Sequence, residues 1–374
     1  MSSAADGIRL SELTTLRVGG PALRMSAPAT RDGLIAAALK MWSGFDDWLV
    51  LGGGSNVVVS DDGVDGDVLR VVTRGISVVD RPVAPHADGS VHLLVEAGEV
   101  WDDVVAFAVG NGLAGIEALS GIPGTAGAAP IQNIGAYGQE LGETLVGLDF
   151  LDFGSGEVER LAASELRLGY RTSALKRGRL GIVLGVELRL AASGGLSLPI
   201  AYAQLATALG VELGARVPLA EVRATVLALR ASKGMIWDPA DPDSISAGSF
   251  FTNPIVSENF ARGLPAESPR WPTEPERPAQ VLPLGSPIPA VAVGSEYLVK
   301  LSAAWLIERA GISRGFSIPG SGAAISHKHT LAIVNRGHAT AHDVVQLANF
   351  VQTRVMSEFG VMLHPEPVLV GISL

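Results

Sequence analysis

The sequence feature that most constrains the fold is a run of three glycines, Gly52, Gly53 and Gly54, between two short apolar segments. Trp48–Leu51 precedes the run and Val57–Val59 follows it, and apolar or β-branched runs of this length predict strands. Consecutive glycines let successive backbone N–H groups point into one concavity, which can hold an anion such as a pyrophosphate. Ser55 and Asn56 add side-chain donors. We expect a phosphate-binding turn, with a plain tight turn as the alternative.

This turn matches neither of the two common nucleotide-binding patterns. In the dinucleotide-binding fingerprint a third glycine stands where this chain has Val57, and a helix rather than a strand follows. A P-loop needs Gly-Lys followed by Ser or Thr, which occurs nowhere in the chain. The turn therefore predicts neither a Rossmann-type dinucleotide site nor a P-loop.

A second unusual segment covers residues 115–138, which are rich in Gly, Pro and Ala and show no clean period. A loop of this length inside a compact domain is normally functional. Its small residues permit a planar ring to lie against the main chain, while Gln132, Asn133 and Tyr137 can hydrogen-bond the polar edge of that ring. We expect it to hold a cofactor, and a packed irregular connection is the alternative.

Strand and helix patterns alternate irregularly along the chain, which predicts an α+β fold with two dissimilar halves. The composition changes near residues 191–195. We expect one domain over 1–192, with subdomains over about 1–78 and 79–192. A second domain would cover 193–374, with a proline-rich exposed insertion at 264–289.

Composition excludes several classes of protein. The formal net charge is -10 and no Lys/Arg-rich block occurs, which argues against binding to nucleic acid. The chain has no cysteine, which excludes disulfides, thiolate metal sites and a flavin attached through cysteine. We find no signal-peptide pattern and no uninterrupted apolar run of about eighteen residues, and expect a cytoplasmic monomer without membrane contact or bound metal.

The glycine-rich motifs resemble those of the UDP-N-acetylenolpyruvoylglucosamine reductase family. The resemblance rests on Gly52-Gly-Gly-Ser-Asn56, Ser120-Gly-Ile-Pro-Gly124 and Pro130-Ile-Gln-Asn-Ile-Gly-Ala-Tyr-Gly138, and covers nearly the whole chain. It implies a flavin domain of the vanillyl-alcohol-oxidase (PCMH) type, with FAD held non-covalently between two α+β subdomains. A C-terminal α+β domain would bind the substrate.

The same resemblance implies the reaction. NADPH reduces FAD, and the enolpyruvyl group of UDP-N-acetylglucosamine enolpyruvate is then reduced to give UDP-N-acetylmuramate for the bacterial cell wall. Hydride added to the β-carbon of an enolpyruvyl ether places negative charge on the α-carbon and carboxylate. The site therefore needs a cation or donor at the carboxylate, an acid for the α-carbon and a clamp on the diphosphate.

Three residues match the family's catalytic groups. Arg171, in Gly169-Tyr-Arg-Thr-Ser173, can fork onto a carboxylate. Ser249 would donate the proton, projecting from a strand over about 249–255 in which Phe250 and Phe251 face opposite sides. Glu366 stands between two prolines, and we expect it to act with Arg171 as a protonated acid, which requires a raised pKa. Read alone, these would be a surface ion pair, an ordinary strand serine and an exposed carboxylate.

Further binding residues follow from the resemblance. Lys233 would contact the diphosphate, Tyr170 and Asn253 would lie in the substrate site, and Tyr202 resembles a tyrosine that closes over UDP in members with a longer lid. The expected FAD-binding residues are Gly52, Gly53, Gly54, Ser55, Asn56, Gly121, Ile122, Pro123, Gly124, Thr125, Gly127, Gln132, Asn133, Gly135, Ala136, Tyr137 and Gly138.

The chain departs from the family pattern at Ala128-Ala129, where small hydroxyl residues are common, so a flavin hydrogen bond is lost or comes from Thr125. His327 and His329 alternate, with no carboxylate near them in the sequence, and we interpret them as a surface edge of the following strand rather than metal ligands. A flavin oxidase acting on an alcohol or sugar, and a non-catalytic UDP-sugar sensor, are the two alternative functions.

Overall fold

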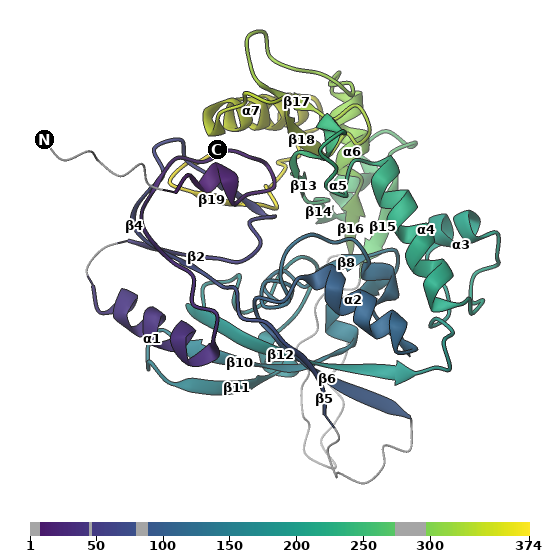
Figure 1. Cartoon of the computed structure of the whole chain (residues 1–374). Coiled ribbons are helices and arrows are strands. Elements are labelled where there is room, and N and C mark those ends of the chain that lie inside the picture. The colour runs from purple at the N-terminus through teal and green to yellow at the C-terminus, as the bar shows by residue number, and fades with distance from the viewer. Residues whose placement is uncertain (1–7, 45–46, 80–88, 274–296) are drawn as a thin grey trace, which may run out of the picture.

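The protein is represented by a computed structural model that describes residues 8–44, 47–79, 89–273 and 297–374. Two sheet-containing regions occupy opposite ends of the molecule, and the N- and C-terminal parts of the chain meet at one side (Figure 1). The cofactor and substrate residues predicted from the sequence lie mainly in the loops between these regions.

The N-terminal region contains a small parallel sheet in the order β1-β4-β2. Its strands are β1 (Ala22–Ser26), β2 (Trp48–Leu51) and β4 (Val64–Arg70). Helix α1 (Arg31–Trp42) connects β1 to β2, and the Thr30 side chain accepts a hydrogen bond from a backbone N–H of its first turn. Thr30 therefore caps the N-terminus of this helix.

The glycine turn, residues 52–56, connects β2 to β3 (Val57–Val59) as expected. Strand β3 pairs in parallel with β19 (Val368–Val370), the last strand of the chain. The Val368 amide also donates to the carbonyl of Asn56 (2.9 Å). This pairing brings the C-terminal segment beside the glycine turn (Figure 1).

A six-stranded antiparallel sheet forms the base of the flavin half, which is the part of the chain up to residue 192 that is expected to hold FAD. Its strand order is β11-β10-β12-β6-β5, with β7 also pairing with β12. Helix α2 (Trp101–Gly110) packs on this sheet, and the buried Trp101 indole donates to the carbonyl of Leu119 (3.1 Å). The six strands are β5 (Ile76–Val79), β6 (Ser90–Glu96), β7 (Leu113–Ala114), β10 (Leu145–Asp152), β11 (Val158–Ala162) and β12 (Gly181–Ala192).

The long loop predicted over residues 115–138 crosses between the two sheets. It begins with a 3-10 turn, Glu117–Leu119, and ends in the small hairpin of β8 (Gly135–Ala136) and β9 (Gln139–Glu140). Ala126 and Ala129 are buried in the core of the flavin half. The loop is therefore packed rather than loose, which fixes the main chain that lines the site.

The C-terminal region has two three-stranded sheets, ordered β13-β18-β17 and β14-β16-β15. Helices α5, α6 and α7 pack on them and share one apolar core. The elements are β13 (Ser246–Ser249), β14 (Ile255–Ser257), α5 (Glu258–Arg262), β15 (Arg270–Thr273), β16 (Leu298–Leu301), α6 (Ala303–Arg309), β17 (Ala323–Ile325), β18 (Ala332–Asn335) and α7 (Ala341–Phe359).

Helices α3 (Ala203–Leu209) and α4 (Leu219–Ser232) bridge the two halves of the molecule (Figure 1). Arg223 on α4 donates two hydrogen bonds to the carboxylate of Asp102 on α2, at 2.6 and 2.7 Å. The Gly121 amide donates to the same carboxylate (2.6 Å). This bidentate ion pair fixes α4, and hence Lys233 at its C-terminal end, relative to the flavin half.

One predicted strand is wrong. The segment expected to form a strand over 249–255 is split between the end of β13 and the start of β14. Its amides instead join separate partners: Phe250 donates to Leu331 O (2.7 Å), and Phe251 forms an isolated bridge with Pro365. Because the chain bends there, Phe250 and Phe251 are both buried, and their rings meet edge to face at 5.1 Å, rather than facing opposite sides.

The domain limits at 1–192 and 193–374 stay a prediction. The proposed subdomain limit at residue 78 falls inside β5, which pairs with β6 in the six-stranded sheet. Most of the proline-rich insertion, 274–289, lies outside the described residues, while its first part includes β15. Across the described parts of the chain, no helix is both long and apolar enough to cross a membrane.

Candidate active site

The glycine turn lies directly against the long loop, and the contact is too close for any side chain. A Cβ placed on Gly53 would lie 2.7 Å from the Cα of Gly124. Gly54 has a φ of +62°, and a Cβ there would lie 2.0 Å from the carbonyl oxygen of Leu13. The Ser55 hydroxyl donates across the contact to Pro123 O (3.1 Å). Glycine is required because two main chains meet here.

A largely apolar cavity of about 190 Å³ opens between the glycine turn and the long loop. Its wall includes main chain of Gly53 and Gly54, side chains such as Ile131 and Ile134, and the polar groups of Ser55, Asn56, Thr125 and Gln132.

The cradle fits a flavin nucleotide. Glycine main chain admits a flat ring and a diphosphate, and a few polar side chains interrupt an otherwise apolar lining. The Asn56 amide donates to Gln132 Oε1 (2.6 Å), which ties the two motifs together beside the cavity. A neighbouring cavity, which includes Gly52 and Gly127, continues from it past Thr125 and Ala128.

A second, polar cavity of about 110 Å³ adjoins the first, and Ser55, Asn56, Pro123, Gln132 and Ile134 line both cavities. The polar cavity contains all three predicted catalytic residues, Arg171, Ser249 and Glu366, together with Ile122 and Gly135. The structure therefore brings the three catalytic candidates together beside the expected flavin site.

Arg171 lies at the tip of a tight turn closed by the paired residues Gly169 and Thr172. Its φ of 54° is left-handed, which is strained for a residue other than glycine. Its guanidinium donates to the carbonyl of Gly135 (Nη2, 2.7 Å), and its Nε lies 3.3 Å from Glu366 Oε1 without a hydrogen bond between them. The cation is held by the loop and aimed into the polar cavity.

Glu366 is largely buried beside two cations, and burial raises the pKa of its carboxyl group more than Arg171 and Lys176 lower it. Its main chain is fixed on both sides, because its amide donates to Phe250 O (2.8 Å) and its carbonyl accepts from Asn56 Nδ2 (3.3 Å). The direction of this shift agrees with the raised pKa expected from the sequence. In its protonated form this carboxyl group can donate a hydrogen bond.

Ser249 ends β13, opposite Ala332 of β18. Its hydroxyl lies 3.3 Å from Nε2 of His329 and faces the polar cavity. Gly248 before it has a φ of +75°, a conformation that directs the chain away from the sheet at this point. The bend places the hydroxyl at the end of a strand rather than within one.

Two predicted substrate residues, Tyr170 and Asn253, contact each other next to Arg171. Asn253 hydrogen-bonds Tyr170, and its Oδ1 accepts from the amide of Ala303 at the start of α6 (3.0 Å). Burial raises the pKa of the Tyr170 phenol, and its ring lies between the Arg171 guanidinium (5.7 Å) and the Lys300 ammonium (4.8 Å). Tyr170 is thus placed to hold Arg171 through a cation–π contact.

The other predicted substrate residues gather at the end of α4. The Lys233 ammonium lies over the Tyr137 ring (5.5 Å) and donates to Gln204 Oε1 (3.1 Å). Tyr202 stands immediately before α3, is 44% exposed, and meets Tyr137 edge to face at 5.9 Å. Burial lowers the pKa of the Lys233 ammonium, with Arg230 lowering it further. Lys233, Tyr137 and Tyr202 therefore form one group of contacting side chains at the C-terminal end of α4.

Some predicted FAD-binding residues do not reach the two main cavities. The side-chain amide of Asn133 is already hydrogen-bonded within the protein. It donates to Glu140 (3.0 Å) and Gly169 (3.2 Å) and accepts from the amide of Gly142 (2.9 Å). Four further residues line neither of the two main cavities: Gly121, Ala136, Tyr137 and Gly138. Of these, Tyr137 and Gly138 line a separate cavity next to α4.

Sequence reasoning missed three polar residues at the site. Lys176 lines the apolar cavity, with Nζ 3.5 Å from the Glu366 carbonyl, and Arg230 lines the polar cavity although only 8% exposed. Burial lowers the pKa of both groups. His329 contacts Ser249, so its interpretation as a surface edge residue is wrong. No sequence motif pointed to Lys176. Arg230 could have been suspected only because it lies about one helical turn before Lys233.

Among the residues that the structure describes, no cluster of three or more His, Cys, Asp or Glu side chains could hold a metal ion.

Comparisons with known proteins identify the class first. A family model described as an FAD binding domain matches residues 26–162, and the cavity between the glycine turn and the long loop lies largely in this part of the chain. The protein is a flavoprotein with FAD as its cofactor, and the predicted fold class is confirmed.

A second model, the C-terminal domain of UDP-N-acetylenolpyruvoylglucosamine reductase, matches residues 240–370. The enzyme of that name from Leifsonia xyli is 62% identical over 98% of both chains, and that of Mycolicibacterium smegmatis is 44% identical over 99% of this chain and 96% of its own. The crystal structure of the enzyme from Thermus caldophilus has 27% identity and a TM-score of 0.60 over 97% of both chains. The chain belongs to the UDP-N-acetylenolpyruvoylglucosamine reductase family.

Proposed function

We propose that this protein reduces the enolpyruvyl double bond of UDP-N-acetylglucosamine enolpyruvate with NADPH, using Arg171, Glu366 and Ser249 as its catalytic residues. FAD, held in the cradle between the glycine turn and the long loop, would supply hydride transfer from NADPH to the terminal enolpyruvyl carbon. The family relationship carries the reaction, and the shared cavity of the three side chains supports their roles.

Arg171 binds the carboxylate of the enolpyruvyl group and remains charged as negative charge develops there. Its turn is already closed and its Nη2 is already bonded to Gly135, so little reorganisation accompanies binding. Burial raises the pKa of Glu366, which favours its protonated form, and in that form it donates a hydrogen bond to the same developing enolate. The two groups together stabilise the charge.

Ser249 donates its hydroxyl proton to the α-carbon. A new C–H bond forms with the electron pair of the enolate, and the O–H bond of Ser249 breaks. Lys233 clamps the diphosphate, and Tyr170 and Asn253 hold the site around the pyruvyl ether. Tyr202, exposed beside Tyr137, closes over the uridine end as the lid.

The single observation that carries these roles is the position of Arg171, Ser249 and Glu366 around one polar cavity that adjoins the cradle of the cofactor. A flavin oxidase needs no separate proton donor for a carbon acid, and a UDP-sugar sensor needs neither donor nor hydride acceptor. Both alternatives leave this arrangement unexplained.

The test follows the flavin absorbance of the purified holoprotein in two anaerobic steps. NADPH is expected to bleach the flavin, and UDP-N-acetylglucosamine enolpyruvate is expected to restore the absorbance while a saturated lactyl ether appears by mass spectrometry. A flavin that stays bleached with this substrate but recovers rapidly in oxygen would favour the oxidase. NADH in place of NADPH measures the preference for the reductant.

We also propose that the protein is a monomer and acts in the cytoplasm, where nucleotide-linked sugars and NADPH are available. Sedimentation of the holoprotein at micromolar concentration should give a single species near the chain mass of 38.7 kDa. A species of twice that mass would overturn the monomer without affecting the proposed reaction.

A further inference from the structure

The hydroxyl of Ser249 is a weak acid, and its use as a proton donor requires a group that stabilises the oxygen as the proton leaves. Among the described residues, the side chain that contacts this hydroxyl is His329, with Nε2 3.3 Å from Oγ. His329 is partly buried, whereas His327 on the same turn has a side chain 61% exposed. The two histidines therefore have different surroundings.

The turn before β18 places His329 above Ser249. The buried hydroxyl of Ser326 accepts hydrogen bonds from the amides of Lys328 (3.0 Å) and His329 (3.2 Å), and the His329 carbonyl accepts from Ala332 (3.0 Å). Because Ala332 pairs with Ser249 across the sheet, the turn lies directly over the serine.

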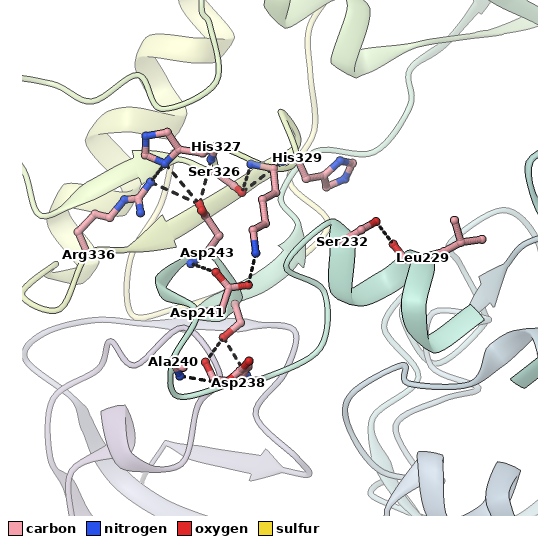
Figure 2. Close-up of polar contacts among 12 residues, drawn as sticks. Leu229, Ser232, Asp238, Ala240, Asp241, Asp243, Ser326, His327, His329 and Arg336 are labelled. Atoms are coloured by element: carbon pink, nitrogen blue, oxygen red, sulfur yellow. Dashed lines mark hydrogen bonds and ion pairs between the residues drawn. The ribbon is translucent and has the colours of Figure 1, made fainter. Parts of the chain in front are cut away.

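A second set of contacts anchors the same turn to the segment before β13. The Asp243 carboxylate accepts from the amide of His327 (2.9 Å) and from Arg336 (3.4 Å), and Lys328 donates to Asp241 (2.7 Å). The His329 ring points away from this cluster (Figure 2). His327 and Lys328 are therefore bonded to this cluster, whereas the His329 side chain contacts Ser249 instead.

The surroundings keep His329 uncharged at neutral pH. Burial lowers its pKa to about 4, and the positive charges of Lys233, Arg314 and Arg230 act in the same direction. A neutral imidazole carries one proton, so it either donates to the serine oxygen or accepts the serine proton. Nearby cations favour an arrangement in which the serine oxygen becomes negative.

We propose that His329 is the positioning residue of Ser249: its Nε2–H donates to the serine oxygen, which leaves the hydroxyl proton free to point at the substrate. This inference rests on the proposed function. As the proton moves to the α-carbon, the imidazole keeps its own proton and stabilises the serine oxygen through the hydrogen bond. Ser249 regains a proton from water before the next turnover.

Replacing His329 by Leu removes the donor, whereas replacing it by Gln retains an N–H group at similar reach. We expect His329→Leu to slow flavin reoxidation by the enolpyruvyl substrate on the order of 100-fold, with flavin reduction by NADPH unchanged within about twofold. His329→Gln is expected to recover most of this rate. His327→Leu, on the exposed side of the same turn, is the matched control.

A structural role alone would impair both steps together, so the ratio of the two rates is the deciding quantity. If His329→Leu is folded, binds FAD and reoxidises at the wild-type rate, the inference is overturned while the proposed function stands. If the wild-type protein itself is not reoxidised by the substrate, the proposed function fails first.

Nitrogen-15 NMR of the histidine rings in the holoprotein provides a readout other than activity. At pH 7 the His329 signals, assigned by their loss in His329→Gln, should show a proton on Nε2 and none on Nδ1. A proton on Nδ1 would mean that Nε2 accepts the serine proton, which contradicts the proposed arrangement.

Discussion

The Nε atom of Arg171 lies 3.3 Å from Oε1 of Glu366, and both groups face one cavity. Arg171 belongs to the flavin half, whereas Glu366 comes from the end of the chain. The parallel pairing of β3 with β19 brings Glu366 beside the glycine turn, since β3 follows the glycine turn and β19 follows Glu366. The glycine turn and the proposed catalytic carboxyl group are therefore positioned by the same pair of strands.

Removing the cation at the substrate carboxylate should affect only the second step of the reaction. We expect Arg171→Met to lower the rate of reoxidation by the enolpyruvyl substrate on the order of 100- to 1,000-fold, with reduction by NADPH nearly unchanged. Arg177→Met, which removes an exposed arginine six residues away, is the control. Stopped-flow absorbance measures both steps, and an equal loss in both would contradict the role.

The buried carboxyl group of Glu366 makes the stability of the protein depend on pH. Its folded-state pKa is raised. At low pH the group is protonated in both the folded and the unfolded state, so it does not change the free energy of unfolding. As pH rises above the ordinary pKa of Glu, ionisation favours the unfolded state and the protein loses stability. Glu366→Gln should therefore stabilise the FAD-free protein more at pH 8 than at pH 4.5. Urea denaturation of both proteins at the two pH values measures this, and a constant difference would refute the shift.

The pKa of His329 predicts the opposite dependence. Because its folded-state pKa of about 4 is below the unfolded value of about 6.5, stability is fully present above pH 6.5 and is lost as pH falls toward 4. The loss at pH 5 should be about 2 kcal/mol relative to His329→Gln. Urea denaturation of the FAD-free protein checks it, and parallel curves for the two proteins would exclude the shift.

The close contact of the glycine turn with the long loop predicts a steric effect on cofactor binding. A Cβ on Gly53 would lie 2.7 Å from Gly124 Cα, whereas a Cβ on Gly110 meets nothing within 4 Å. We expect Gly53→Ala to weaken FAD binding at least tenfold, because two main chains must separate. Gly110→Ala should bind normally. Fluorescence titration of the FAD-free proteins measures the FAD affinity of both variants. Unchanged affinity in Gly53→Ala would contradict the prediction, because it would show that the two main chains can separate without weakening FAD binding.

The local elements of the fold were predictable where one signal dominated. A Thr followed three residues later by an acidic residue favours a capping box, and Thr340 and Asp343 form one at the start of α7, while Gly360 ends this helix in the left-handed conformation. The segment after Ser249 was not predictable, because its backbone partners, Leu331 and Pro365, come from distant segments and bend the chain. Tertiary hydrogen bonds there override a strand pattern that the residues favour locally.

The candidate site divides in the same way. Family motifs indicated Arg171, Ser249 and Glu366, and the structure brings them to one cavity. Those motifs could not tell that the amide of Asn133 holds its own loop together, since its partners Glu140 and Gly169 are fixed only in three dimensions. His329 was misjudged because the sequence shows its alternation with His327 and not the serine on the neighbouring strand.

The proton donated to the α-carbon gives the most direct test of the account. In Ser249→Ala, stopped-flow absorbance should show FAD reduction by NADPH within about twofold of the wild-type rate. Reoxidation by UDP-N-acetylglucosamine enolpyruvate should fall by a factor on the order of 1,000 or more. Equal losses in the two steps, or rapid reoxidation in the variant, would contradict the assignment of Ser249 as the proton donor.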